Sequence, residues 1–336
     1  MEKTSSFKNG VSYNETNILC VMTMTRIIVV NYPGASVSAV HGLQELFALS
    51  NDAALTLEHG HQFRCSIVNA DLIASEPVAP ADYILLPPAL NDVFYMQAAD
   101  TLCRWLISQN EAGAVLASAC AGAFILARTG LLDNKRCTTH WGLAGKFRDN
   151  FGHLSLKPDA ILINEGSVIT SGGMMSWIDL GLEIVGQAAS ARQMQLTGKW
   201  LVVDTGPREQ RFYRRFTPDF SHADKPVIKA QHYIAEHIQM PLDNQTLASH
   251  IHLSTRSLQR RFVAATGLSV KEYVQAVRIQ QACDLLESDN STIEHISLCV
   301  GYSNVAAFRK VFQRILGLTP TAFRQRFNKH GSRPES

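Results

Sequence analysis

The sequence predicts two domains of different classes: an α/β domain with a parallel sheet, followed by an all-α domain with two helix-turn-helix units. Short β-branched runs alternate with amphipathic helical patterns up to about residue 190, as in parallel α/β folds. One unit of sequence occurs twice between residues 242 and 327. The charges divide in the same way. Residues 207–336 hold 18 Lys and Arg against 11 Asp and Glu, whereas residues 1–206 hold 13 against 18.

The 336 residues, of which 46% are apolar, suffice for two sizeable cores. We expect little structure in residues 1–23, the α/β domain in 24–190, a join in 191–224 and the all-α domain in 225–330. The basic carboxyl-terminal part indicates a nucleic-acid partner, and the acidic part a different role. The join is expected to be a solvated basic linker. Its arginines are Arg208, Arg211, Arg214 and Arg215.

The seven cysteines are scattered, without a CxxC pair or the spacing of metal ligands. Such a set predicts reduced thiols in a cytoplasmic protein, with neither a disulfide framework nor a metal site. No cofactor is expected. The apolar stretch 18–30 is too short and too interrupted by polar residues to span a membrane, so we expect no membrane partner.

The α/β pattern places strands at short apolar, β-branched runs. The first, residues 26–31, ends at Tyr32-Pro33-Gly34, which predicts a buried parallel strand followed by a loop. Further strands are expected at residues 63–68, 83–86, 114–118 and 167–170. Covering helices are expected at residues 40–49, 100–109 and 177–185.

Each copy of the repeated unit predicts a helix, a tight turn and a second helix. Leu258, Phe262 and Gly267 return 50 residues later as two phenylalanines and a glycine. Ser254 can cap the second helix of the first copy, whose apolar residues then share one side. The opposite side carries Arg256, Gln259 and Arg260, with Arg261 on the flank. In the second copy the outward positions are Ala306, Arg309, Lys310 and Gln313.

These outward side chains have the chemistry that a DNA major groove requires. Arg can pair with guanine and Gln with adenine, while flanking cations neutralise phosphates. The alternative is a pair of solvated amphipathic helices, which would be as good an explanation for either copy alone. Duplication with matched outward positions favours DNA.

The carboxyl-terminal third resembles the AraC-type transcriptional regulators. The matching stretches are STRSLQRRFVAATG, SVKEYVQAVRIQQACDLL and IEHISLCVGYSNVAAFRKVFQRILGLTPTAFR. The resemblance implies two helix-turn-helix units joined by a long helix, with their second helices in successive segments of the major groove. The base-facing positions it implies are Arg256, Gln259, Arg260, Val305, Ala306 and Arg309. The apolar pair in the second unit would read thymine methyls or mainly position the protein.

In the α/β domain, Cys120 is the residue whose position most favours nucleophilic chemistry. An apolar strand leads into it, and small residues, beginning with Ala121, then open a helix, as a sharp strand-to-helix turn requires. A cysteine at a helix N-terminus has its thiolate favoured, so we expect an accessible, acidic thiol. His140 and Trp141 follow downstream and are expected beside it. The alternative is a buried inert cysteine and a hydrogen-bonded histidine.

Residues 26–186 resemble PfpI/ThiJ-type domains, which are related to class I glutamine amidotransferases. The stretches are YPG, SACAGAFILARTGLLDNKRCTTHW and ITSGGMMSWIDLGLEIV. The resemblance implies a flavodoxin-like parallel sheet, and with the AraC-type tail it implies the GlxA-like regulators. Catalytic members carry an acidic residue where this chain has Ala39, and Glu45 lies one to two helical turns further on. A Cys–His pair without an acid is a poor hydrolase, so we interpret the site as a pocket kept for binding. The candidate effector pocket is formed by Cys120, Ala121, His140 and Trp141.

The sequence-based hypothesis is therefore a cytoplasmic transcriptional regulator, with activation favoured, and not an enzyme. Its expected partners are operator DNA, a small-molecule effector, a second copy of the chain and, for an activator, RNA polymerase. Resemblance suggests an amine or amino-acid derivative as effector, with Trp141 and Trp177 as a cation–π wall. Two alternatives stay open: a Cys-dependent hydrolase fused to a DNA-binding domain, and a DNA-binding scaffold whose α/β domain only dimerises.

Overall fold

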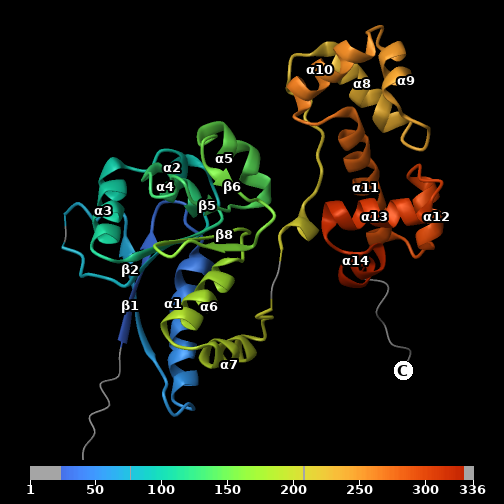
Figure 1. The fold of residues 1–336 in the computed structure, drawn as a ribbon. Coiled ribbons are helices and arrows are strands. Elements are labelled where there is room, and N and C mark those ends of the chain that lie inside the picture. Colours follow the sequence, from blue (N-terminus) through green and yellow to red (C-terminus); the bar gives the residue numbers. More distant parts are fainter. Residues whose placement is uncertain (1–23, 76, 207–208, 329–336) are drawn as a thin grey trace, which may run out of the picture.

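The computed structural model describes residues 24–75, 77–206 and 209–328. They form an amino-terminal α/β domain and a carboxyl-terminal helical domain, joined by a single connection (Figure 1). We call these the front and back domains. Both predicted fold classes are confirmed. The expected amino-terminal extension, residues 1–23, lies outside the described residues.

The front domain is built on one six-stranded sheet with the strand order β2-β1-β3-β4-β8-β7. All neighbouring pairs are parallel except β7 and β8. The strands are β1 (Met24–Asn31), β2 (Gln62–Asn69), β3 (Tyr83–Leu86), β4 (Val115–Ala119), β7 (Leu162–Asn164) and β8 (Val168–Ser171). The five strands predicted from the sequence are confirmed. The short edge strand β7 was not predicted, nor was the pair β5 (Arg136–Cys137) and β6 (Ser155–Leu156).

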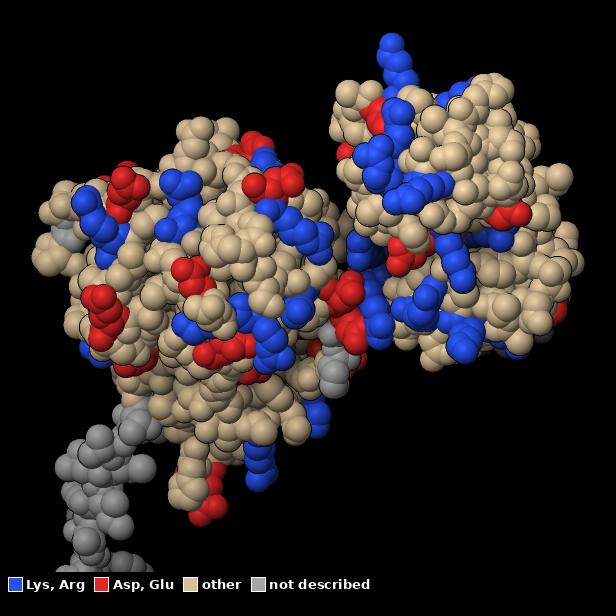
Figure 2. Space-filling model, turned by 45° about the horizontal axis from the view of Figure 1, so that its top comes forward, with Lys and Arg blue, Asp and Glu red and all other residues tan. Residues whose placement is uncertain are grey.

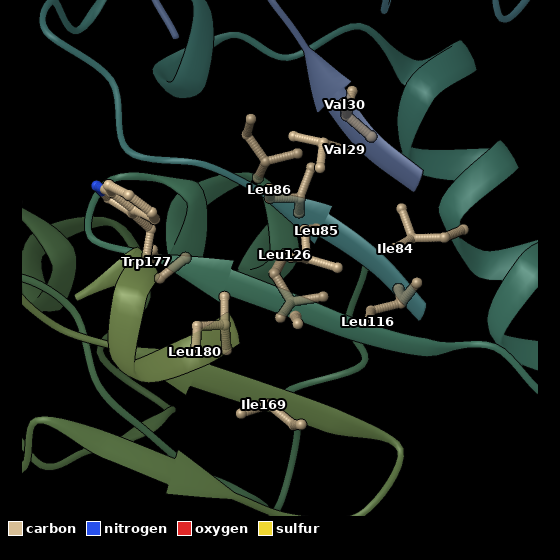
Figure 3. Close-up of a cluster of buried hydrophobic side chains, with 14 of the residues drawn as sticks. Val29, Val30, Ile84, Leu85, Leu86, Leu116, Leu126, Ile169, Trp177 and Leu180 are labelled. Atoms are coloured by element: carbon tan, nitrogen blue, oxygen red, sulfur yellow. The ribbon is translucent and has the colours of Figure 1, made fainter. Parts of the chain in front are cut away.

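Helices cover both faces of this sheet, as an all-buried parallel core requires (Figure 1). One face carries α1 (Val37–Ala54), α6 (Trp177–Ala188) and α7 (Ala191–Leu201). The other carries α2 (Val93–Met96), α3 (Asp100–Glu111), α4 (Gly122–Arg128) and α5 (Ala144–Asn150). The central strands are buried on both sides. Val29 and Leu85 are register partners on one face of the sheet, and Ile84 and Leu116 are partners on the other. Figure 3 shows these side chains together with Leu180 and Trp177 of α6.

The back domain consists of seven helices within the described residues. They are α8 (Lys225–Glu236), α9 (Asn244–His250), α10 (Thr255–Thr266), α11 (Val270–Ser288), α12 (Ile293–Cys299), α13 (Val305–Leu316) and α14 (Pro320–Phe327). Both helices of each helix-turn-helix unit begin at a side-chain cap. Asp243 and Ser254 cap α9 and α10 in the first unit, and Thr292 and Asn304 cap α12 and α13 in the second. The sequence repeat thus corresponds to a repeated structure, α9–α10 and α12–α13.

Two separate hydrophobic cores hold these units, and α11 contributes to both. Its first turns bury Tyr273 and Val274 against α8, α9 and α10. Its last turns bury Ile279, Ala282 and Leu286 against α12, α13 and α14. The buried apolar residues of α11 therefore lie on one side of the helix in its first turns and on another side in its last turns.

The segment 191–224, expected as a join, begins with a helix that packs on the front domain. Helix α7 lies against α1 and α6. Its Gln193 is fully buried, and the carboxamide donates to the carbonyl and hydroxyl of Ser50 and to the carbonyl of His61. The sequence gives little sign of this helix, because its buried face is held by polar side chains.

The described arginines of this basic linker are solvated, with side chains 32%, 53% and 66% exposed, but they are also paired. Arg211, Arg214 and Arg215 each lie within ion-pair distance of an acidic side chain, namely Glu209, Asp159 and Asp284. Asp159 belongs to the front domain and Asp284 to α11 of the back domain, so the connection is paired on both sides. Arg208 lies outside the described residues.

A close approach of α4 to β3 yields a stability prediction. A Cβ on Gly122 would overlap the carbonyl oxygen of Leu86, which is sheet backbone and cannot move aside. Gly122→Ala should therefore destabilise the front domain by about 1–3 kcal/mol. All four tryptophans lie in this domain, at positions 105, 141, 177 and 200, so their fluorescence during urea unfolding reports on it alone.

Gly145 of α5 is the matched control, because a Cβ there meets nothing within 4 Å. Gly145→Ala should be neutral or slightly stabilising, since alanine is the better helix residue. Equal unfolding midpoints for the two variants would contradict the packing argument.

Candidate nucleic-acid interface and ligand pocket

The first candidate recognition helix, α10, separates its buried and exposed residues as the sequence predicts. Leu258 and Phe262 are fully buried in the first core. Arg256, Gln259 and Arg260 are exposed. Within the described residues, neither arginine lies within ion-pair distance of an acidic side chain. The two guanidinium groups are thus available to an anionic partner.

The second candidate recognition helix, α13, buries Phe308 and Phe312 in the same manner. Ala306, Arg309 and Lys310 are exposed, and Val305 is half-buried. Unlike the arginines of α10, Arg309 already has a partner: its Nη2 lies 2.9 Å from Oε1 of Glu294 on α12. Both groups are exposed, so this pair is weak and salt-sensitive.

The carboxyl-terminal part of the chain carries an excess of positive charge. Figure 2 shows the visible face of the back domain carrying more Lys and Arg than Asp and Glu. The front domain, by contrast, shows both signs intermixed on its visible face. This distribution agrees with the excess of basic residues counted in residues 207–336 and suits a polyanionic partner for the back domain.

Arg261 has a structural partner that the sequence did not reveal. Its guanidinium forms two hydrogen bonds of 2.9 Å to the carboxylate of Asp224. Asp224 also caps α8, accepting from the backbone N–H of Val227 at 3.1 Å. The Arg261 side chain and the cap hold the pKa of Asp224 below its usual range. Arg261 therefore ties α10 to the start of α8, and its contact with DNA stays a prediction.

The strand-to-helix turn at Cys120 is present. Cys120 has a φ of 54°, a left-handed conformation that is rare outside glycine, between the end of β4 and the start of α4. Two hydrogen bonds fix its backbone. The N–H donates to the carbonyl of Ser171 at 2.8 Å, and the carbonyl accepts from the Thr139 hydroxyl at 2.7 Å.

The expectation of an accessible, acidic thiol is wrong. Cys120 is only 4% exposed, and burial raises its pKa to about 11, although the Ala121 backbone N–H favours the thiolate. Desolvation therefore outweighs the field of the helix terminus. Burial has a visible cause: Tyr32 lies nearby, its hydroxyl donates to the Pro87 carbonyl, and Phe94 stacks on its ring at 5.3 Å.

His140 and Trp141 follow the turn but do not form a pair with the thiol. The Nδ1 of His140 accepts from the backbone N–H of Gly142 at 2.9 Å, and its ring lies 5.2 Å from that of Trp141. Burial lowers the pKa of His140. Within the described residues, no hydrogen bond joins His140 to Cys120.

The acidic position of a catalytic site is also missing. Ala39 is fully buried (0% exposed) in α1, packed in the front core. Glu45 lies on the same helix but is exposed to solvent, so it cannot replace a buried carboxylate. Burial, which raises the pKa of the Cys120 thiol, and a backbone hydrogen bond from Ala121, which lowers it, set that pKa.

An open cleft lies beside this closed site, where the sequence predicted none. It has a volume of about 310 Å³ and is lined by Pro33, Gly34, Asn91, Val93, Phe94 and Gln97. These residues follow the neighbouring strands β1 and β3. From β1 the chain continues to β2 on one side of the sheet, and from β3 it continues to β4 on the other side. Ligands of open α/β sheets bind at such a switch point. The short helix α2, which supplies the far wall, has no periodicity that the sequence could reveal.

Comparisons with known proteins agree with this architecture. Residues 25–187 match the DJ-1/PfpI family, and residues 247–326 match a helix-turn-helix domain. The HTH-type transcriptional regulator CdhR of Pseudomonas aeruginosa is 23% identical over 276 residues, which cover 78% of this chain and 82% of that one. The HTH-type transcriptional regulator GlxA of Rhizobium meliloti is 26% identical over 207 residues, covering 61% and 64%. The crystal structure of Drosophila melanogaster DJ-1beta aligns with a TM-score of 0.42 and 19% identity, over 54% of this chain and all of that one.

The burial of Cys120 predicts slow alkylation with a defined pH dependence. With a pKa of about 11, only about one thiol in a thousand is ionised at pH 8. The rate with iodoacetamide should therefore be low at neutral pH and rise about tenfold per pH unit up to pH 10. Mass spectrometry of digests gives the rate at Cys120, with the half-exposed Cys299 as internal reference. An alkylation rate at Cys120 that exceeds the rate at Cys299 and no longer rises above pH 7 would instead support an accessible, acidic thiol.

Proposed function

We propose that this chain, which joins a DJ-1/PfpI domain to an AraC-type helix-turn-helix domain, is a sequence-specific DNA-binding transcriptional regulator. Its front domain binds a small-molecule effector without catalysis. The observation that carries the proposal is the duplicated recognition helix with outward Arg256, Gln259 and Arg260. The relatives CdhR and GlxA are both named as transcriptional regulators. The GlxA match spans less than two-thirds of that protein.

The back domain suits DNA that is read at two neighbouring places. Helix α11 joins the two units, and each unit presents one helix, α10 or α13, for the major groove. On successive groove segments about one helical turn apart, one chain would read a direct half-site. Arginine and glutamine on α10 supply bidentate contacts to guanine and adenine. Val305 and Ala306 on α13 offer mainly apolar contact, and Arg309 has to exchange Glu294 for DNA.

In this hypothesis the back domain binds DNA and the front domain forms the dimer. Two such half-sites would be bound by a homodimer formed through the front domains, and an activator would also contact RNA polymerase. We place the protein in the cytoplasm. None of the helices in the described ranges combines the length and apolarity that crossing a membrane needs.

The alternative function, a Cys-dependent hydrolase, is supported by the sharp turn at Cys120 and by the DJ-1/PfpI match. Three observations count against it: the buried thiol with its raised pKa, the apolar Ala39 in place of an acid, and the engagement of His140 with Gly142. Each would have to change before a proton could be moved from the thiol to a base. Turnover of an amide or glyoxal substrate that disappears in Cys120→Ser would support the alternative.

We place the effector in the open cleft above Tyr32, beside the closed Cys120–Ala121 turn. Its lining carries the amides of Asn91 and Gln97, the ring of Phe94 and no ionised side chain. An aromatic face and amide oxygens suit an amine or an amino-acid derivative. Trp177, considered above as part of a cation–π wall, is buried against Gly42 of α1 and belongs to the core.

The DNA assignment predicts which substitutions remove base preference. Arg256→Ala and Arg260→Ala should each weaken binding to the cognate site by about 1–3 kcal/mol and relax the preference at the contacted base. The cognate site can be selected from random DNA with the wild-type chain, and affinity measured by fluorescence anisotropy at several salt concentrations. Wild-type affinity in both variants would remove α10 from the interface.

Arg261→Ala separates a structural role from a phosphate contact. Loss of the pair with Asp224 should lower the back-domain unfolding midpoint in circular dichroism and leave base preference unchanged. The folded pKa of Asp224 is depressed, so this contribution is present at neutral pH and is lost as pH falls through that low pKa. The difference between wild type and variant should therefore shrink in acid. An unchanged midpoint with a smaller salt dependence of DNA binding would instead favour the phosphate contact.

The effector cleft can be tested with a pair of exposed apolar residues. Val93 lines the cleft and is 72% exposed, whereas Leu55, at the far end of α1, is 73% exposed and does not line it. Compounds from a panel of amines and amino-acid derivatives that raise the melting temperature of the wild type should lose this effect in Val93→Arg and keep it in Leu55→Arg. A shift that survives in Val93→Arg would place the effector elsewhere. No shift with any compound would favour a front domain that only dimerises.

A further inference from the structure

One residue of the connection between the domains is held as firmly as a core residue. Gln210 is 1% exposed. Its Nε2 donates to the carbonyls of Thr139 and Ala160, both at 2.9 Å, and to the Thr138 hydroxyl at 3.2 Å. Its Oε1 accepts from the backbone N–H of Trp141 at 3.1 Å. The carboxamide thus uses both its donor and its acceptor groups inside the front domain.

The slot that receives this side chain is shaped for it. A Cβ on Gly172, the residue after β8, would overlap the Gln210 carboxamide nitrogen. The backbone on either side is paired as well. The Gln210 N–H donates to the Asp159 carbonyl at 2.8 Å, and Glu209 forms an antiparallel bridge with Ala160. The connection therefore enters the front domain at a built position and does not merely pass over its surface.

A single residue, Thr139, connects this slot to the turn at Cys120 by hydrogen bonds. Thr139, whose carbonyl accepts from Gln210, donates its own hydroxyl to the Cys120 carbonyl at 2.7 Å. A change in the position of the turn would therefore alter the hydrogen bonds that hold Gln210.

The residues that follow Gln210 contact the second helix-turn-helix unit. They form a 3₁₀ turn, η2 (Arg211–Tyr213). The guanidinium of Arg211 lies against Gly317, the residue that caps the carboxyl end of α13. Arg326 of α14 lies 5.3 Å from the ring centre of Phe212 and 5.6 Å from that of Tyr213, and donates to the Tyr213 hydroxyl at 3.0 Å.

The contacts continue onto the helix shared by both units. The backbone N–H of Phe216 donates to Oε1 of Gln280 on α11 at 2.8 Å. The ring of Phe216 meets that of Tyr273 edge-on at 5.3 Å. Within eight residues, 209–216, the chain thus leaves a slot in the front domain and is fixed to both α13 and α11. We call these residues the coupling segment.

We propose that the coupling segment, anchored by Gln210, transmits the state of the front-domain pocket to the second recognition helix. The proposal rests on the proposed function, because it assigns the path between an effector and DNA. Gln210 is a positioning residue: it contacts neither effector nor DNA and acts through η2 on the end of α13.

Chain length and satisfied hydrogen bonds both link the slot to α13. Arg211 follows Gln210 directly, so a displacement of the slot cannot be absorbed before it reaches Gly317. The alternative state, with Gln210 withdrawn, leaves the Thr139 and Ala160 carbonyls and the Trp141 N–H without their partner. A buried polar group without a partner is costly, so withdrawal is a discrete change and not a gradual one.

The first test uses the shape of the carboxamide. Gln210→Glu keeps the volume but replaces the NH₂ donor with an oxygen facing two carbonyl acceptors, so the side chain should leave the slot. The full-length variant should then be cut by trypsin at Arg211, Arg214 or Arg215 at least about tenfold faster than the wild type, because cleavage requires local release of the segment. Cleavage sites and rates are read by mass spectrometry.

The matched control is Gln193→Glu. Gln193 is likewise a buried glutamine of the front domain, and its carboxamide also donates three hydrogen bonds, but to Ser50 and His61. This variant should lower the front-domain melting temperature as Gln210→Glu does, while linker cleavage, measured well below that temperature, stays at the wild-type rate. Equal cleavage rates in the two variants would overturn the anchoring role of Gln210.

The second test concerns transmission. Binding of the selected DNA site to the wild type should slow hydrogen exchange of the Trp141 amide, which donates to Gln210, although this amide lies in the front domain. The effect should be absent in Gln210→Glu and present in Gln193→Glu. Exchange at Trp141 that ignores bound DNA in the wild type would refute transmission. If the wild type selects no DNA sequence at all, the proposed function fails, while the cleavage comparison still decides whether Gln210 anchors the segment.

Discussion

The double burial of α11 is the constraint on which the back domain depends. One helix supplies Tyr273 and Val274 to the first core and Ile279 and Leu286 to the second. The two recognition helices therefore have a fixed separation and rotation, set by the number of residues between these buried positions. One residue more would turn the second unit by about 100° and move it about 1.5 Å along the axis. The spacing between α10 and α13 is thus encoded in a single helix.

Because the two units move together, the remaining freedom is the placement of the pair relative to the front domain. The paired arginines of the connection add little to this, since exposed ion pairs such as Arg214 with Asp159 contribute at most about 1 kcal/mol. The contacts at either end, of the buried Gln210 in its slot and of the half-buried Phe216 on α11, are better placed to restrict it. A basic linker composition thus says little about how firmly such a linker is held.

The sequence predicts the elements whose signals are local and periodic. Strands β1 to β4 and the two helix-turn-helix units follow from short β-branched runs and from apolar residues at helical spacing. What it could not predict depends on residues distant in the chain. The pKa of Cys120 is raised by burial beneath a loop that contains Tyr32, and Arg261 pairs with an aspartate 37 positions away. The slot of Gln210 combines three separate segments, none of which has a periodic pattern.

The turn at Cys120 has a role that does not require its thiol. Burial of the thiol and the apolar Ala39 are both unfavourable for nucleophilic chemistry at Cys120. The strained backbone nevertheless persists, with a φ of 54° that must be offset by its surroundings. Its carbonyl accepts from Thr139, and Thr139 in turn accepts from Gln210. The backbone of this turn is thus linked through Thr139 to the residue that anchors the coupling segment, a contact that does not involve the thiol.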